Sequence, residues 1–170
     1  MLCYKTILLK DRSECLLHSP VGERDAVKLQ ELSGRILSET DFISLENPLF
    51  FRNTLSEASF LELIADSSDC LLLLAEINEV PAGCACLVTG GNGQHEIGIA
   101  VRDSMSERGL GSAMLSLLIR KAKSAGIHSL FLKVHADNHR AISLYSKFGF
   151  SFYETTPSDI IRFMRLDITD

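Results

Sequence analysis

The stretch that decides the fold is residues 95–134, which read HEIGIAVRDSMSERGLGSAMLSLLIRKAKSAGIHSLFLKV. Residues 95–101 indicate a strand, and residues 129–134, rich in Leu, Phe and Val, indicate another. Between them, residues 109–125 predict a helix that ends at Gly126, a residue that tolerates the left-handed conformation. The apolar residues at helical spacing are Leu110, Met114, Leu117, Leu118 and Ala122. A strand, a helix and a second strand predict a crossover between parallel strands.

The first third of the chain is expected to be mainly helical after one short strand. The strand is predicted over residues 14–18, and a loosely amphipathic helix over 21–38. Thr54 is followed three residues later by Glu57, a spacing typical of a capping box. This pair predicts a helix to about Ala65.

Strands dominate the remainder of the chain. Residues 70–77 and 81–89 are apolar runs separated by Asn78-Glu79, so they predict a hairpin. Two further strands are expected over residues 150–155 and 160–167. The parallel crossover therefore sits inside an antiparallel meander. We expect an α+β layered fold whose mixed, mostly antiparallel central sheet is flanked by helices.

Length and composition place the chain in a broad class. Its 170 residues, 46% of them hydrophobic, fit a single domain over 1–170. The 17 basic and 22 acidic side chains give a net charge of −5, which argues against nucleic acid as a partner. No apolar run is long enough for a membrane span, and the first residues lack signal-peptide character. An odd count of five cysteines without a Cys-x-x-Cys pair predicts a reducing, cytoplasmic location and no metal site.

A glycine-rich helix entrance is the first candidate for a binding site. It comprises Arg108, Gly109, Leu110, Gly111, Ser112 and Ala113. The first N–H groups of a helix lack intrahelical acceptors, and small residues let a phosphate approach them. The run lacks the lysine of a Walker loop, and Met114 stands where a dinucleotide fingerprint requires a third small residue. The alternative is a tight strand-to-helix turn with no ligand.

A second motif lies downstream and, together with the first, carries a family resemblance. Its matching residues are Asn138, Ala141, Leu144, Tyr145, Gly149 and Phe150. Asn138 is also the predicted cap of a helix that runs to about Phe148. The two motifs resemble the signatures of the GCN5-related N-acetyltransferases (GNAT), Arg/Gln-x-x-Gly-x-Gly/Ala and Asn-x-x-Ala-x-x-Leu-Tyr-x-x-x-Gly-Phe. The resemblance is specific over about 94–155.

The resemblance implies acetyl-CoA as the donor and a small-molecule or peptide amine as the acceptor. Residues 108–113 would hold the CoA diphosphate through backbone N–H groups. The strand end at Ile99, Ala100 and Val101 would pair with the pantetheine arm in a slot between 97–101 and 130–134. Asn138 would lie near the pantetheine or the attacking centre.

Two side chains are the candidate catalytic groups. Tyr145 matches the family's acid position and would protonate the leaving thiolate. The alternative is a buried tyrosine with its hydroxyl at the rim. Glu96 is the candidate base, because it lies at the start of the strand where the resembled family often places a glutamate that acts directly or through water. It shares a strand face with the small Gly98 and Ala100, which leave room for a substrate. The alternative is a solvent-facing carboxylate, and His95, on the opposite face, is a weaker base candidate.

The predicted function is transfer of the acetyl group of acetyl-CoA to a primary amine by direct attack in a ternary complex. A catalytically silent acyl-CoA sensor is the main alternative, and a nucleotide-binding module is a third. In the resembled family the segment with Asp41, Phe42 and Glu46 shapes the acceptor pocket, and these residues would favour a cationic amine. Homodimers are common in that family, so the resemblance also favours a homodimer.

Overall fold

The computed structural model describes residues 4–42, 61, 62, 64, 66–90, 92–154 and 160–168. The strands are β1 (Tyr4–Leu8), β2 (Glu14–His18), β3 (Leu71–Ile77), β4 (Val80–Thr89), β5 (His95–Val101), β6 (Ser129–His135), β7 (Ser151–Glu154) and β8 (Ile161–Asp167). The helices are α1 (Gly22–Glu39), the 3-10 turn η1 (Asp103–Met105), α3 (Leu110–Ser124) and α4 (His139–Lys147).

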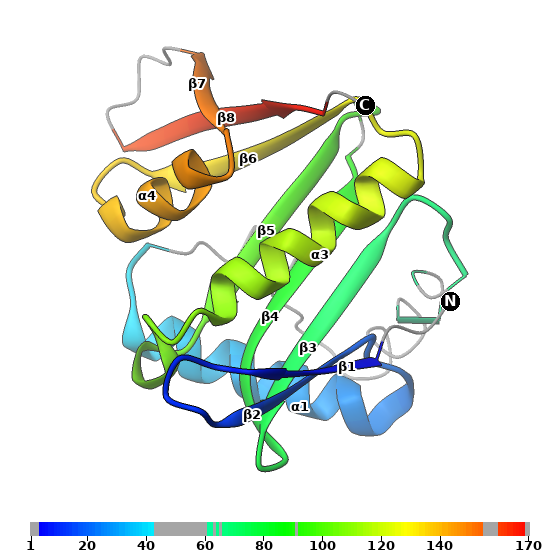
Figure 1. Ribbon diagram of the computed structural model, residues 1–170, viewed down its shortest axis with the longest axis vertical. Coiled ribbons are helices and arrows are strands. Elements are labelled where there is room, and N and C mark those ends of the chain that lie inside the picture. Colours follow the sequence, from blue (N-terminus) through cyan, green and yellow to red (C-terminus); the bar gives the residue numbers. More distant parts are fainter. Residues whose placement is uncertain are drawn as a thin grey trace.

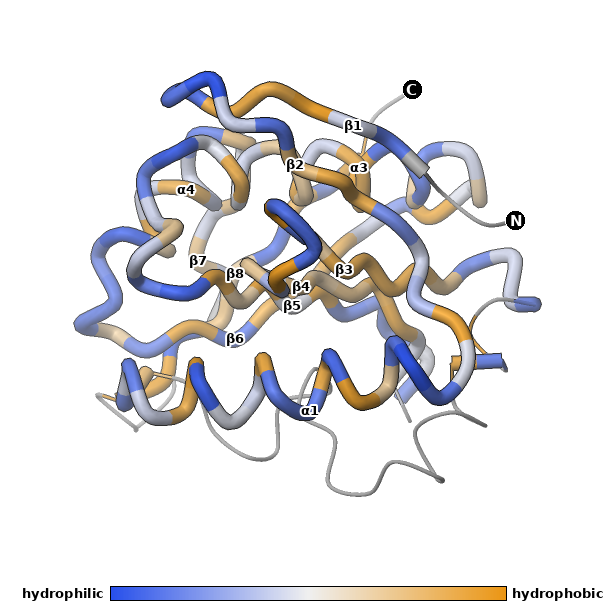
Figure 2. Tube along the Cα trace, turned by 90° about the horizontal axis from the view of Figure 1, so that it is seen from below, coloured by the Kyte–Doolittle hydropathy of each residue, from blue (hydrophilic) through white to orange (hydrophobic). Residues whose placement is uncertain are grey.

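The described strands form one sheet in the order β1-β2-β3-β4-β5-β6-β8-β7. Neighbouring strands are antiparallel except β5 and β6, which are parallel and joined through α3. Helix α1 covers one face of the sheet, while α3 and α4 cover the other (Figures 1 and 2). The predicted mixed sheet with helices on its faces is confirmed.

Two apolar cores fill the spaces between these layers. One lies between the sheet and α3 and α4, and includes Met114 and Leu118. The other lies under α1 and includes Leu29 and Leu32, both with no exposed surface. Every residue of β3 is buried, which explains why residues 71–75 form an apolar run rather than an alternating pattern; the one charged residue of the strand, Glu76, is buried as well.

Local backbone geometry matches the turn residues in the sequence. Asn78 and Glu79 connect β3 to β4 with φ of 50° and 65°, the positive values that tight two-residue hairpin turns require. Gly126 follows α3 with φ of 70°, as predicted. The Asn138 side-chain oxygen accepts a hydrogen bond from the Ala141 N–H at 3.1 Å, which confirms it as the cap of α4.

Strand β1 is a correction to the sequence-based expectation, which placed only one strand before α1. Residues 4–8 form an antiparallel hairpin with β2 and occupy the edge of the sheet. The helix predicted from Thr54 lies largely outside the described residues; Leu61, Glu62 and Ile64 within it are helical. None of the described helices has both the length and the apolar character needed to cross a bilayer.

Candidate active site

The parallel strands β5 and β6 separate soon after they meet. Only two residue pairs connect them, His95 with Leu130 and Glu96 with Phe131. Beyond that point β5 stays paired with β4, and β6 stays paired with β8. The two strands therefore form a V that widens toward α4 (Figure 1).

The exposed edge of β5 presents alternate peptide groups to this V. The Arg102 N–H donates to the Ala82 carbonyl on β4 at 3.0 Å. Because successive peptide groups in a strand point to opposite sides, those of Ile99 and Val101 point away from β4, toward the opening. The Ala100 backbone points back toward β4. Its carbonyl lies 2.8 Å from the place where a Cβ on Gly83 would sit.

A cavity of about 740 Å³ occupies the opening of the V. Its walls come from the β1–β2 turn, the end of α1, the end of β5, the start of α3 and one face of α4. All predicted cofactor-binding residues except Arg108 and Ala113 line it: Ile99, Ala100, Val101, Gly109, Leu110, Gly111, Ser112, Asn138 and Tyr145. The structure thus brings residues from both sequence motifs to one cavity.

The entrance of α3 offers the backbone donors that the sequence predicted. Gly109 is the N-cap residue with φ of 91°, a conformation that favours glycine, and no side chain caps the helix. Among the described residues no acceptor faces the N–H groups of residues 109–112. The prediction that the Ala113 N–H binds the diphosphate is wrong. This N–H donates to the Gly109 carbonyl at 3.0 Å and is not available to a ligand.

The Arg108 side chain turns away from the cavity. Its Nη1 donates to the Asp11 carboxylate at 2.7 Å, and its Nη2 donates to the Ser104 carbonyl at 3.1 Å. The guanidinium therefore ties the helix entrance to the β1–β2 turn. Arg108 belongs to the run that the resemblance assigns to the CoA diphosphate, but the cavity-lining residues do not include it.

Gly111 allows α3 and α4 to approach each other. A Cβ at this position would lie 3.1 Å from Leu144 Cδ2, a distance shorter than ordinary van der Waals contact. Both residues line the cavity and both belong to the sequence motifs. The spacing of the two motifs thus corresponds to a contact between their helices.

Tyr145 is a buried phenol at the wall of the cavity. Its residue surface is 5% exposed, and its ring contacts the Phe150 ring at 5.7 Å between centroids. Within the described part of the chain its hydroxyl has no hydrogen-bond partner. Burial, with a smaller contribution from nearby Cys86, raises the pKa of the Tyr145 hydroxyl above its usual range. A protonated phenol held in an apolar wall can donate a proton to a leaving group.

The candidate base lies elsewhere. Glu96 is not among the residues that line the cavity, and its Oε1 lies 3.3 Å from the place where a Cβ on Gly90 would sit. His95 points to the opposite face, with its Nε2 3.6 Å from Asp69 Oδ2. The structure therefore does not bring Glu96 and Tyr145 together at the cavity.

Several polar residues of the cavity had no signal in the sequence. Glu39, at the end of α1, accepts from Arg102 Nε at 3.3 Å and from the Asp103 N–H at 2.8 Å. Asp103 in turn accepts from Arg140 on α4 at 2.9 Å. This chain of contacts joins three elements around the cavity, and its partners are 37 to 64 residues apart in the sequence.

The segment after α1 is described only in part. Phe42 lines the cavity, and its ring lies 5.1 Å from the ring of His135. Asp41 is exposed, and Glu46 lies outside the described residues. Of the residues expected to shape an acceptor pocket, Phe42 alone is placed at the cavity.

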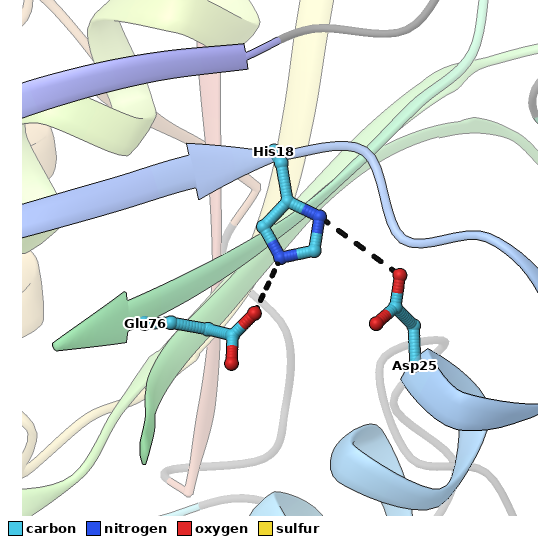
Figure 3. A group of neighbouring side chains, drawn as sticks. All are labelled: His18, Asp25 and Glu76. Atoms are coloured by element: carbon cyan, nitrogen blue, oxygen red, sulfur yellow. Dashed lines mark hydrogen bonds and ion pairs between the residues drawn. The ribbon is translucent and has the colours of Figure 1, made fainter. Parts of the chain in front are cut away.

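A second polar group lies between β2, β3 and the start of α1 (Figure 3). His18 Nε2 bonds Glu76 Oε1 at 2.7 Å, and His18 Nδ1 lies 3.9 Å from Asp25 Oδ2. Lys28 donates to the other Glu76 oxygen. We call these four residues, His18, Asp25, Lys28 and Glu76, the ion cluster.

The ion cluster is a poor metal site despite its ligand types. A metal ion would use one ring nitrogen of His18, whereas the two nitrogens face different carboxylates. The Lys28 ammonium already occupies the remaining oxygen of Glu76. The donor set therefore suits paired charges rather than a cation.

Comparisons with known proteins point to one family. The model of the Acetyltransferase (GNAT) family matches residues 39–150, more than half of the chain. L-methionine sulfoximine/L-methionine sulfone acetyltransferase from Pseudomonas paraeruginosa is 32% identical over 81 residues, which are 47% of each chain. The matched part thus spans about half the length of this curated relative.

Solved structures agree with this match. A GNAT-family acetyltransferase from Streptococcus pneumoniae superposes with a TM-score of 0.80 and 26% identity, covering 91% of this chain and 99% of that chain. The structure of yncA from Salmonella typhimurium with its cofactor acetyl-CoA has a TM-score of 0.74 and 19% identity, covering 92% and 95%. At 19% identity, the similarity to yncA shows a shared fold alone.

Proposed function

We propose that this chain, which belongs to the GNAT acetyltransferase family, transfers the acetyl group of acetyl-CoA to a primary amine by direct attack in a ternary complex. The membership confirms the family resemblance, the fold and the acyltransferase class expected from the sequence. One observation carries the finer proposal. Within the part of the chain that the structure describes, one cavity combines an open strand edge with helix N–H groups and a Tyr145 hydroxyl that have no hydrogen-bond partner.

The residues of the cavity suit the parts of acetyl-CoA in order along its length. The N–H groups of residues 109–112 suit the diphosphate, because they combine hydrogen-bond donors with the positive end of the α3 dipole. The peptide groups of Ile99 and Val101 suit the amides of the pantetheine arm. Acetyl-CoA supplies the activated thioester. The protein must stabilise the charge that develops on the carbonyl oxygen and move the protons.

The reaction assigns a task to each remaining group. The amine nitrogen forms a bond to the thioester carbon while the carbon–sulfur bond breaks. The Val101 N–H would stabilise the negative charge on the carbonyl oxygen, and Tyr145 would give its proton to the leaving thiolate. The amine must lose a proton, and Glu96 would accept it only through water because it does not line the cavity.

The acceptor is proposed as a small-molecule or peptide amine. The Pseudomonas relative is named for two small amino-acid derivatives, which supports a small acceptor. Phe42, which lines the cavity and lies near His135, would contact such a molecule. We also propose a cytoplasmic location, where acetyl-CoA and reduced thiols coexist; the cysteines at 15, 70, 84 and 86 are free thiols.

A pooled-amine assay tests the proposal. Purified protein and acetyl-CoA are incubated with polyamines, amino acids, aminoglycosides and short peptides, and products are identified by mass spectrometry. We expect one acetylated class that disappears with Tyr145→Phe. Tight acetyl-CoA binding with no product across a broad amine panel would instead support the acyl-CoA sensor. Absence of acetyl-CoA binding would refute both functions.

A further inference from the structure

The β1–β2 turn lies against the entrance of α3, although about 97 residues separate them in the sequence (Figure 1). The Lys10 N–H donates to the Arg108 carbonyl at 3.0 Å. The Arg108 guanidinium returns a bond to Asp11 at 2.7 Å. These two contacts fix the turn beside the helix N–H groups to which we assign the diphosphate.

The positive charge of Arg108 is compensated within this contact. Asp11 also accepts from the Ser13 N–H at 3.1 Å and from the Ser13 hydroxyl at 2.6 Å. These hydrogen bonds, aided by the charge of Arg108, lower the pKa of Asp11, so the carboxylate is ionised at neutral pH. Arg108 therefore connects the β1–β2 turn to the loop before α3, and its guanidinium does not line the cavity.

Lys10, unlike Arg108, brings a basic side chain to the wall of the cavity. Its Cγ and Cε atoms lie 3.8 and 3.9 Å from the place where a Cβ on Gly109 would sit, so its chain runs across the glycine. It lines the cavity together with Gly109 and Ser112. Among the described residues its ammonium has no acidic partner. A cation thus lies beside open N–H groups at the positive end of a helix, an arrangement that attracts an anion.

We propose that Lys10, from the β1–β2 turn, binds the diphosphate of acetyl-CoA, and that Arg108 positions this lysine through Asp11. The inference rests on the proposed function, because it assigns a binding residue to the same donor site. It makes the N-terminal hairpin part of the cofactor site, although neither sequence motif includes it.

The test measures binding rather than turnover. Dissociation constants are obtained by calorimetry for acetyl-CoA, for its 3′-dephospho form and for acetyl-pantetheine, which has no diphosphate. We expect Lys10→Gln to weaken both diphosphate ligands about 10-fold and to leave acetyl-pantetheine unchanged. Lys10→Arg should restore most of the loss. Lys5→Gln, which removes an exposed lysine from the same hairpin, is the matched control and should equal wild type.

Each other outcome has a definite meaning. If wild-type protein binds no acetyl-CoA, both the proposed function and the role of Lys10 are wrong. If wild type binds and Lys10→Gln binds equally well, only the role of Lys10 fails. An effect that disappears with the 3′-dephospho ligand would move Lys10 to the 3′-phosphate and overturn the diphosphate assignment. An equal loss for acetyl-pantetheine would show a structural role and overturn it as well.

Discussion

The ion cluster and the cavity are two polar regions of one small protein, and they differ in how their groups are paired. In the ion cluster the buried polar side chains bond one another: Glu76 bonds both His18 and Lys28, and Asp25 lies beside His18. In the cavity the described N–H groups of residues 109–112 and the Tyr145 hydroxyl face no acceptor. The polar groups of the ion cluster are bonded to one another, whereas those of the cavity are available to a ligand.

The difference follows from the cost of burying polar groups. A buried donor or acceptor without a partner costs on the order of 1–3 kcal/mol. This cost bears on the ion cluster and on the Tyr145 hydroxyl, whereas residues 109, 111 and 112 are partly or fully exposed, so water can bond their N–H groups until a ligand replaces it. The cluster joins β2, β3 and α1, and we expect it to act on stability. The cavity joins the ends of β5, α3 and α4, and we expect it to act on ligand binding and turnover.

The largest expected effect is on turnover and belongs to the cavity. Tyr145→Phe removes the proposed proton donor and keeps the ring packed against Phe150. We expect kcat to fall by about 10²–10⁴-fold, the usual contribution of general acid catalysis, with little change in acetyl-CoA affinity. Steady-state kinetics and calorimetry measure the two quantities. Unchanged kcat would exclude Tyr145 as the acid. It would also mean that the unbonded Tyr145 hydroxyl does not distinguish the cavity from the ion cluster in function.

The second effect should be confined to stability. Glu76→Gln leaves His18 and Lys28 facing a neutral side chain, and the Glu76 and His18 side chains are only 7% and 6% exposed. Removing one partner of a buried ion pair costs about 3–5 kcal/mol, so the urea midpoint should fall while kcat of the folded enzyme stays the same. Glu31→Gln, at an exposed position of helix α1, is the control. A normal midpoint for Glu76→Gln would mean that the cluster carries little stability.

The same cluster predicts how stability depends on pH. Burial raises the pKa of Glu76, but the hydrogen bonds from Lys28 and His18 outweigh it, so the folded pKa is lower than usual. The folded state then binds a proton less readily than the unfolded state. The stabilisation is present above the unfolded pKa of about 4.3 and is lost as pH falls through the lower folded pKa. Urea midpoints from pH 7 down to pH 3 should fall more steeply for wild type than for Glu76→Gln.

The cavity makes a further prediction through Gly111. A valine there would place its side chain against Leu144, 3.1 Å from the nearest atom already at the Cβ. We expect Gly111→Val to weaken acetyl-CoA binding about 10-fold, because the entrance of α3 must move away from α4. Calorimetry measures this loss. Gly34→Val, at an open position on α1, controls for the cost of valine in a helix; wild-type affinity in Gly111→Val would mean that the helices need not approach so closely.

The sequence predicted the parts of the molecule that depend on local patterns. The crossover at residues 95–134, the hairpin turn at Asn78-Glu79 and the Asn138 cap each follow from spacing within a few residues, and each is confirmed. Tyr145, a residue of the second motif, lies on α4 and lines the cavity. Periodicity and turn chemistry contain this information directly.

The missed features depend on contacts between distant segments. Strand β1 is five residues long, and its place at the edge of the sheet depends on pairing with β2. The diversion of Arg108 to Asp11 needs the β1–β2 turn and α3 to meet, which no local pattern predicts. Glu96 shared a face with small residues as expected, but the cavity formed farther along β5, at Ile99 to Val101. A strand pattern gives the face of a side chain without its distance from the opening.

The smallest expected effect lies at the ion pair between Asp103 and Arg140, which stands at the cavity and yet resembles the ion cluster in chemistry. Its Nη2–Oδ1 distance is 2.9 Å, but the two side chains are 56% and 57% exposed. Water screens such a pair, so Arg140→Gln should change the free energy of unfolding by less than about 1 kcal/mol, and added salt should remove the difference. A double-mutant cycle with Asp103→Asn in urea isolates the pair. A coupling as large as the cost of about 3–5 kcal/mol expected for Glu76→Gln would show that pairing alone, without burial, accounts for the stability of the cluster. A coupling near zero would locate the difference between the two regions in burial.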